Sequence, residues 1–134
     1  MGAPAQLDLG DATSMPYENR RFDSVMSMLA LHEMAQQTRL GALSEMKRVL
    51  KEDGHILLID FHPGPYQPIQ SWISKVIIFF SEVAAGREHY RNHRQFLAAK
   101  GLAPLASLCQ LEVEKQSILA GGTLAVLLAG GRKT

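Results

Sequence analysis

Apolar and polar positions follow periods that change from one segment of this chain to the next. Residues 23–29 begin with an aspartate and are then apolar on both alternating faces apart from two small serines, which is typical of a strand covered on both sides. Residues 36–51 have a helical period, with one apolar stripe and cations in the last turn. A turn at Asp53-Gly54 ends this helix, and 56–59 follow as a continuous apolar run. This strand–helix–strand order predicts a parallel strand pair joined by a helical crossover.

The flanking segments predict further elements of both kinds. A short strand is expected over 6–9, stopped by Gly10, and a rigid loop over 63–68, which holds three prolines and a glycine. Apolar residues then recur at helical spacing over 69–83. A further helix is predicted over 90–100, ended by Gly101.

The tail holds two strand candidates, 103–111 and 123–128. Gly121-Gly122 introduces the second one, which favours an antiparallel strand pair at the sheet edge. Together the elements predict an α/β layered sheet. We expect it to be mostly parallel, with an antiparallel carboxyl-terminal strand pair and helices on both faces.

Composition narrows the class of protein. The 134 residues are 46% hydrophobic with a net charge of +1, which indicates one folded soluble domain and no electrostatic reason for a nucleic-acid partner. The single cysteine, Cys109, suits a reducing cytoplasm. The first residues lack the pattern of a secretory signal, and the most apolar stretch, 76–80, is too short to span a bilayer. We therefore expect a cytoplasmic protein without an integral membrane segment.

Residues 10–25 carry the most informative motif. They read Gly-Asp-Ala, a short spacer, Pro-Tyr, a polar turn, and then Phe-Asp-Ser-Val entering a strand. Three further segments follow in order: Met-Leu-Ala-Leu-His at 28–32, Arg-Val-Leu-Lys-Glu-Asp-Gly at 48–54, and Phe-Leu to Gly-Leu over 96–102. In this order the motifs resemble those of class I S-adenosylmethionine-dependent methyltransferases, of the small-molecule, ubiquinone/menaquinone-biosynthesis type.

The resemblance implies an incomplete Rossmann-like sheet. In the family a half-domain with a glycine-rich cofactor loop precedes the Gly-Asp-Ala motif, whereas nine residues precede it here. We therefore expect one truncated domain over 1–134, with 6–61 as the cofactor side, 62–101 as a helical lid or cover, and 102–134 as the terminal strand pair. The stretch Leu-Asp-Leu-Gly at 7–10 looks like the start of a cofactor loop, but no further glycines follow it, and we interpret the likeness as coincidental.

The resemblance also implies the cofactor contacts. Asp11 is expected to accept a hydrogen bond from the adenine amino group of S-adenosylmethionine, and the Ala12 backbone completes the adenine contact. Met28 and Leu29 line the methionine side of the cofactor, and His32 lies near the methyl-transfer centre. The alternative for Asp11 is an ordinary turn residue after a strand.

Methyl transfer depends chiefly on positioning, and a base is needed only where the acceptor must lose a proton. The candidate catalytic bases are His32 and His62. The expected substrate contacts come from the strand end, the cover and the following helix: Phe61, His62, Trp72, His89, Tyr90 and His93. The helix around Trp72 serves either as core or as an apolar wall for the acceptor, and each histidine has the alternative of an ordinary surface or helix-end position. No metal site is expected, because a third ligand at matching spacing does not accompany His89 and His93.

Two functions stay open at this point. The first is a methyltransferase acting on a small, partly apolar acceptor, and the second is a non-catalytic module for dimerisation or partner binding. A chain without the family's first half exposes an edge of the 23–29 strand, and such an edge pairs or aggregates. We therefore expect a homodimer or docking on a separate amino-terminal half. Titration with S-adenosylmethionine separates the two functions.

Overall fold

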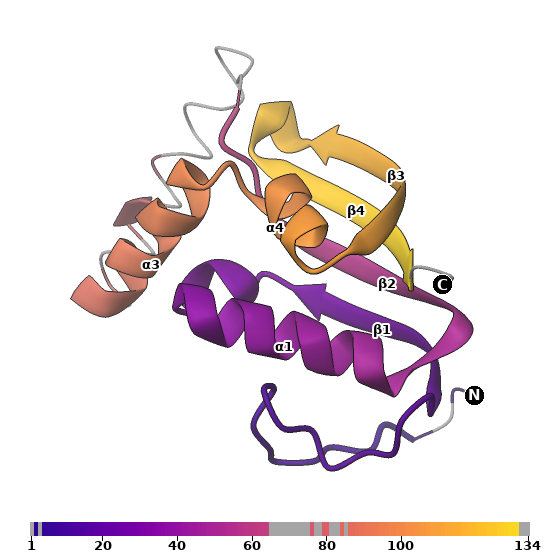
Figure 1. The fold of residues 1–134 in the computed structure, drawn as a ribbon. Helices are drawn as coiled ribbons and strands as arrows, with labels where there is room; N and C mark the ends of the chain where they lie inside the picture. Colours follow the sequence, from indigo (N-terminus) through magenta and orange to yellow (C-terminus); the bar gives the residue numbers. More distant parts are fainter. Residues whose placement is uncertain are drawn as a thin grey trace.

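The computed structural model describes residues 2, 4–64, 76, 79, 80, 84 and 86–131. Its centre is a four-stranded sheet in the order β1 (Phe22–Met28), β2 (Leu50–Phe61), β4 (Leu124–Gly131) and β3 (Leu111–Leu119) (Figure 1). β1 and β2 are parallel, whereas β4 runs antiparallel to both β2 and β3. The predicted parallel pair and the predicted antiparallel carboxyl-terminal pair are both confirmed.

One face of the sheet is covered by α1 (Gln36–Val49) and α4 (Leu102–Leu108), which both lie in front of it in Figure 1. Their apolar sides pack against alternate residues of β2 and β4, because alternate side chains of a strand share a face. The core between these four elements comprises Leu43, Met46, Ile56, Leu58, Leu102, Leu105, Ala106, Ala125, Leu127 and Ala129. α3 (Arg87–Ala98) lies where β1 ends and adds Phe96 to this core.

The opposite face of the sheet carries a second apolar surface, which we call the open face. Its rows follow from the strand register: Met26, Leu57 and Leu128 form one row, and Met28, Ile59 and Val126 form the next. Met26 and Met28 are 62% and 58% exposed, respectively. β1 is also the end strand of the sheet, and no strand among the described residues pairs with its outer edge.

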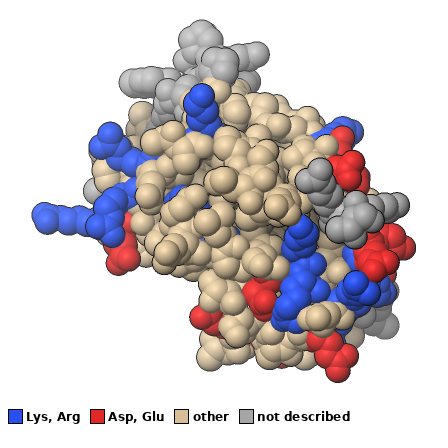
Figure 2. Space-filling model, viewed as in Figure 1, with Lys and Arg blue, Asp and Glu red and all other residues tan. Residues whose placement is uncertain are grey.

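The face in Figure 2, viewed as in Figure 1, is the helix-covered one. Lysine and arginine side chains lie beside aspartate and glutamate side chains at its margins, and a broad area between them carries neither. This mixture of signs agrees with the net charge of +1.

The predicted elements around the crossover are confirmed, with one shifted border. The helix predicted over 36–51 ends at Val49, and β2 begins at the next residue. Leu50 is already extended (φ −78°, ψ 137°) because it pairs with Phe22 of β1. Asp53-Gly54 therefore lies inside β2, and the prediction that it ends the helix is wrong. The helix predicted over 90–100 is α3, and the strand predicted over 123–128 is β4.

The strand predicted over 6–9 is wrong. These residues belong to no strand, and the side chains of Leu7 and Leu9 are almost wholly exposed. So short a segment keeps a strand conformation only when a neighbouring strand binds its backbone. No described strand lies beside it.

The strand predicted over 103–111 is also wrong, because this segment forms α4 before β3 begins at Leu111. Leu102, Leu105 and Ala106 are buried at the i, i+3, i+4 spacing of a helix face. Gly101 separates α4 from α3 with a φ of 75°, a conformation that suits glycine. The chain therefore turns sharply between two short helices and does not extend into a strand.

Two further details differ from the expectations, although the α/β class is confirmed. The sheet has one parallel and two antiparallel pairs, so it is mixed and not mostly parallel. α1 and α4 share one face, so the described helices cover β1 on one side and leave Met26 and Met28 exposed on the other. The helix predicted over 69–83 falls largely outside the described residues. Within that range the structure describes Val76, Phe79 and Phe80, and all three are helical. Among the described helices, none has the length and apolar character needed to cross a membrane.

Candidate functional site

The carboxyl ends of β1 and β2 meet at one end of the sheet, which is where ligands bind in open α/β sheets. The Leu29 amide donates to the Ile59 carbonyl (2.8 Å), and Leu29 then turns the chain away from the sheet with a φ of 51°. The next residues form the short helix η1 (Leu31–Glu33). Met28 and Leu29 stay exposed at this end, whereas His32 is buried with 3% of its surface accessible.

A buried carboxylate organises this end of the sheet. Asp60, on β2, has no exposed surface. Its Oδ2 accepts hydrogen bonds from the amides of Leu31 (3.0 Å) and His32 (3.2 Å). Its Oδ1 lies 2.7 Å from His32 Nδ1 and accepts from the Phe61 amide at 2.8 Å. Since a carboxylate only accepts hydrogen bonds, Nδ1 is the protonated nitrogen of this imidazole.

A buried guanidinium from α1 holds the other side of η1. Arg39 is fully buried, and its Nε donates to the Leu31 carbonyl at 2.7 Å. One terminal nitrogen donates to the carbonyls of His32 (3.4 Å) and Asn92 (2.6 Å). Burial lowers the pKa of Arg39 from its usual value, and the nearby charge of Asp60 opposes that effect. The guanidinium stays charged and balances the Asp60 carboxylate.

α3 closes the site from the third side. The Asn92 side chain donates to the Glu33 carbonyl at 2.8 Å. The rings of His32, Phe61 and His93 pack edge to face, with centroids 4.6 to 5.3 Å apart. The Glu33 carboxylate lies 3.9 Å from His32 Nε2 and 4.0 Å from His89 Nδ1. We call His32, Glu33, Arg39, Asp60 and Asn92 the polar cluster.

Asp11 and Ala12 lie on a different part of the molecule, the loop before β1. Asp11 Oδ1 accepts hydrogen bonds from the amide and the hydroxyl of Thr13, both at 2.8 Å, and these bonds lower the pKa of Asp11. This is the turn role that the sequence left open. The loop is attached to α1, since Glu45 accepts from the Met15 amide at 2.7 Å. The structure records no contact between Asp11 and the polar cluster among the described residues.

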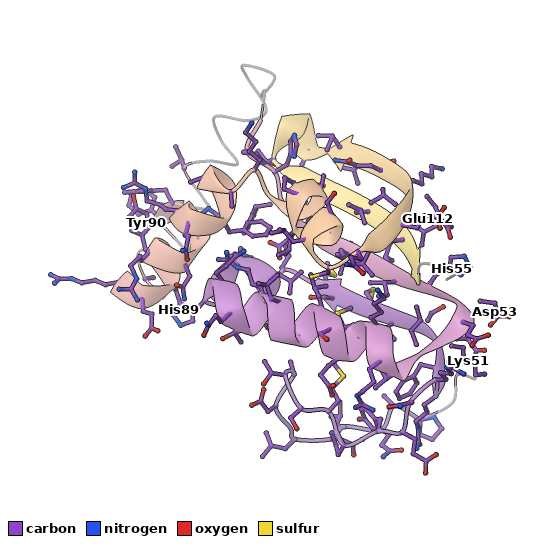
Figure 3. The ribbon with its side chains drawn as sticks, viewed as in Figure 1. Lys51, Asp53, His55, His89, Tyr90 and Glu112 are labelled. Carbon is purple, nitrogen blue, oxygen red and sulfur yellow. The ribbon has the colours of Figure 1, made fainter. Side chains whose placement is uncertain are left out.

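The structure thus brings together four of the predicted residues: His32, Phe61, His89 and His93. Tyr90 lies on α3 and packs against Phe79, with ring centroids 6.3 Å apart. Figure 3 shows His89 and Tyr90 on α3, far from Asp53, His55 and Glu112 at the opposite end of the sheet. His62 follows β2, and its amide donates to the Thr123 carbonyl at 2.8 Å. Trp72 lies outside the described residues.

Sequence reasoning missed Asp60, Arg39 and Asn92. Asp60 did leave a signal, because it is the one charged residue in the apolar run over 56–61. A charge at that place is tolerated only where other groups satisfy it. Arg39 and Asn92 left no such signal, because a polar residue on a predicted helix is expected to face solvent.

Comparison with known proteins shows which family and which folds this chain is similar to. The model of a family described as "Methyltransferase domain" matches residues 2–58. A ubiquinone/menaquinone biosynthesis C-methyltransferase of Bordetella avium is 36% identical over 70 residues, which is 51% of this chain and 27% of the relative. An uncharacterized methyltransferase of Synechocystis is 29% identical over 126 residues, covering 93% of this chain and 55% of the relative.

Solved structures share the fold at lower identity. The PH0226 protein of Pyrococcus horikoshii matches with a TM-score of 0.62 and 14% identity, over 92% of this chain and 57% of that one. A 1,6-didemethyltoxoflavin-N1-methyltransferase of Burkholderia thailandensis, solved with bound 1,6-didemethyltoxoflavin and S-adenosylhomocysteine, matches with a TM-score of 0.57 and 11% identity. It is covered over 48% of its length, against 91% of this chain.

The mixed α/β sheet therefore has the fold of methyltransferase domains. Over residues 2–58 the chain is similar to the methyltransferase-domain family, and its fold is that of solved S-adenosylmethionine-dependent methyltransferases. It spans 27% and 55% of the length of the two curated relatives named above.

Proposed function

We propose that this chain is part of an S-adenosylmethionine-dependent methyltransferase that acts on a small, partly apolar molecule. The observation that carries the proposal is the end of β1, where exposed Met28 and Leu29 adjoin the buried His32. An apolar wall, Met28 and Leu29, and a titratable group, His32, thus meet at the end of the sheet where ligands bind.

Several described residues fit the cofactor. Asp11 is exposed, and the described residues donate only to its Oδ1, which leaves Oδ2 as an acceptor for the adenine amino group. Met28 and Leu29 offer apolar surface to the methionine end of the cofactor. When bound, S-adenosylmethionine supplies an electrophilic methyl group. The proposed role of this chain's own residues is to orient the acceptor and to exclude water around it.

The proposed division of labour follows the chain. Residues 6–61 bind the cofactor, 62–101 cover the acceptor, and 102–134 complete the sheet. Phe61, His62, Trp72, His89, Tyr90 and His93 contact the acceptor, and His32 takes a proton from it. A cytoplasmic location is part of the proposal and is supported by Cys109, the free thiol of the described residues, whose pKa is raised by burial.

Calorimetric titration with S-adenosylmethionine tests this function. We expect micromolar binding, and Asp11→Asn should weaken it about tenfold through loss of one charge-assisted hydrogen bond. Asp53→Asn, an exposed carboxylate at the other end of the sheet, is the matched control and should leave the affinity unchanged. Absence of heat at millimolar ligand would contradict the proposal.

A second candidate is a non-catalytic module for dimerisation or partner binding. It is favoured by a specific observation, the exposed methionines of the open face beside a β1 edge that no described strand pairs. The partner would be a second copy of this chain or a separate amino-terminal half of a methyltransferase domain. Sedimentation at micromolar concentration distinguishes a monomer from a self-associated form, because a monomer mass in every buffer contradicts self-association.

A further inference from the structure

We propose that the outer face of α3, together with two exposed aromatic residues that precede it, is a docking surface for an anionic lipid bilayer. We call it the basic–aromatic surface, and it comprises Arg87, Arg91, Arg94, Phe79 and Phe80. The inference goes beyond methyl transfer, because it depends on charge and exposure and not on the cofactor.

The two faces of α3 have different surroundings. Asn92, His93 and Phe96 are buried against the rest of the protein. The three arginines follow one another at the i, i+4 and i+7 spacing of a single helix face, and all three are exposed. Because successive residues of a helix are turned by about 100°, the arginine face points away from the buried one.

Positive charge is concentrated on this helix. Residues 86–100 hold three arginines and one lysine against one glutamate, although the whole chain has a net charge of only +1. Among the described carboxylates, none forms an ion pair with Arg87, Arg91 or Arg94. Cationic side chains project at the left of Figure 2, where α3 lies in the same view of Figure 1. Exposed cations gathered on one face attract the headgroups of anionic lipids.

Aromatic side chains continue the arginine face. Phe79 and Phe80 are 51% and 66% exposed, and their rings pack edge to face with centroids 5.8 Å apart. Phe79 also contacts Tyr90 of α3, with ring centroids 6.3 Å apart. The Arg94 guanidinium lies 5.9 Å from the centroid of the same tyrosine ring. Through Tyr90, the phenylalanine pair and the arginines form one continuous surface.

A bilayer surface matches both parts of this surface. Its headgroups carry negative charge for the arginines, and phenylalanine rings enter the boundary between headgroups and acyl chains. Arginine also suits this boundary, because its apolar stem lies along lipid while its charged end stays among the headgroups. An acidic peptide would neutralise the arginines, but it offers no apolar layer for two neighbouring phenylalanines.

Co-sedimentation with unilamellar vesicles tests the surface with no cofactor or acceptor present. The full chain should bind vesicles of phosphatidylcholine mixed with phosphatidylglycerol, and it should bind pure phosphatidylcholine much more weakly. Binding should fall as salt rises, because the Debye length shortens from about 10 Å at 0.1 M to about 3 Å at 1 M. Arg87→Gln, Arg91→Gln and Arg94→Gln, made singly and together, should lower the vesicle affinity about fivefold for each arginine replaced.

Two matched controls separate this surface from general effects of charge and apolarity. Arg20→Gln, Arg21→Gln and Lys115→Gln together remove three exposed cations elsewhere, and the vesicle affinity should stay largely unchanged. Phe80→Ser should weaken vesicle binding about tenfold, because the ring no longer leaves water. Leu108→Ser, at a leucine that is also 66% exposed but lies on α4, should leave binding unchanged.

Absence of vesicle binding, or equal affinity for both kinds of vesicle, would overturn the proposal. An equal loss in the two triple variants would overturn it as well. Binding of a polyglutamate peptide without binding of vesicles would assign the arginines to an acidic protein partner instead. Failure to bind S-adenosylmethionine in calorimetry, with vesicle binding intact, would overturn only the proposed function.

Discussion

Arg39 connects more of the site than any other single side chain. It donates to carbonyls of η1 and α3 and packs its guanidinium over Phe96 at 5.0 Å, while itself lying on α1. A buried carbonyl without a donor is costly, so the arginine fixes the relative positions of three elements. The same side chain keeps Asp60 electrically compensated.

Arg39→Met should therefore destabilise the fold by about 2–4 kcal/mol, since methionine keeps the apolar contact but removes every donor. Urea unfolding followed by circular dichroism measures the effect. Arg20→Met is the matched control: its ion pair with Glu52 is exposed at both partners and should contribute little. Equal midpoints for both variants would contradict this role of Arg39.

Glu45 should make stability depend on pH in the acidic range. Its bonds to Arg48 and to the Met15 amide lower its pKa from 4.5 to about 2. Because the folded-state pKa is lowered, the ionised carboxylate stabilises the fold above about pH 4.5, and this contribution is lost as pH falls toward 2.

In Glu45→Gln the urea midpoint should accordingly be lower than in the unmodified protein at pH 7, and the difference should shrink toward pH 2. Glu18→Gln changes an exposed carboxylate on the loop before β1, to which Glu45 binds, and controls for general charge effects. A constant difference between pH 7 and pH 2 would show that the Glu45 contribution is not electrostatic.

Single residues were predicted where a motif names them and missed where burial decides their role. His32 followed from the family motif, and the structure does place it among Phe61, His89 and His93. Its partners Asp60 and Arg39 did not follow, because their burial depends on how β2, α1 and α3 meet. Helical period shows which face is apolar, but not that one cation on it is enclosed by another element.

At the scale of elements, prediction succeeded where an apolar period is sustained along the segment. It failed where contacts with neighbouring elements decide whether the segment is a helix, a strand or irregular. α1 and β2 carry sustained periods and were found. The 103–111 segment is apolar but short, and such runs suit a strand or a helix equally. The 6–9 segment has strand-like residues, yet in the structure it has no strand neighbour among the described residues and stays irregular.

The close contact between the starts of β1 and β2 depends on a glycine. A Cβ at Gly54 would lie 2.8 Å from the Asp23 carbonyl and 2.7 Å from the Leu50 side chain. Gly54→Ala should therefore force β1 and β2 apart locally and cost about 1–3 kcal/mol. Thermal unfolding measures this cost, with Gly10→Ala as control, because a Cβ there meets only Pro16 at 3.6 Å. An unchanged melting temperature in Gly54→Ala would contradict the close strand contact.

At the scale of the whole molecule, the described helices α1 and α4 cover one face of the sheet, and no described helix covers the other. The helix-covered face has a continuous core, whereas the open face leaves Met26 and Met28 largely accessible beside an unpaired edge. An exposed apolar surface next to a strand edge marks an interaction site. The second candidate function and the first both need this surface, since either a partner or the rest of a methyltransferase sheet would cover it.

Met26→Glu combined with Met28→Glu should weaken any assembly through the open face at least tenfold, about 1.4 kcal/mol, because each copy would have to desolvate two charges. The fold itself should persist, since both side chains are already more than half exposed. Leu108→Glu is the matched control: this leucine is 66% exposed on α4, which packs against the opposite face, and its replacement should leave the assembly intact. Sedimentation velocity over a concentration series measures the masses. If the double variant and the control dissociate alike, or neither does, the open face is not the surface through which this chain associates.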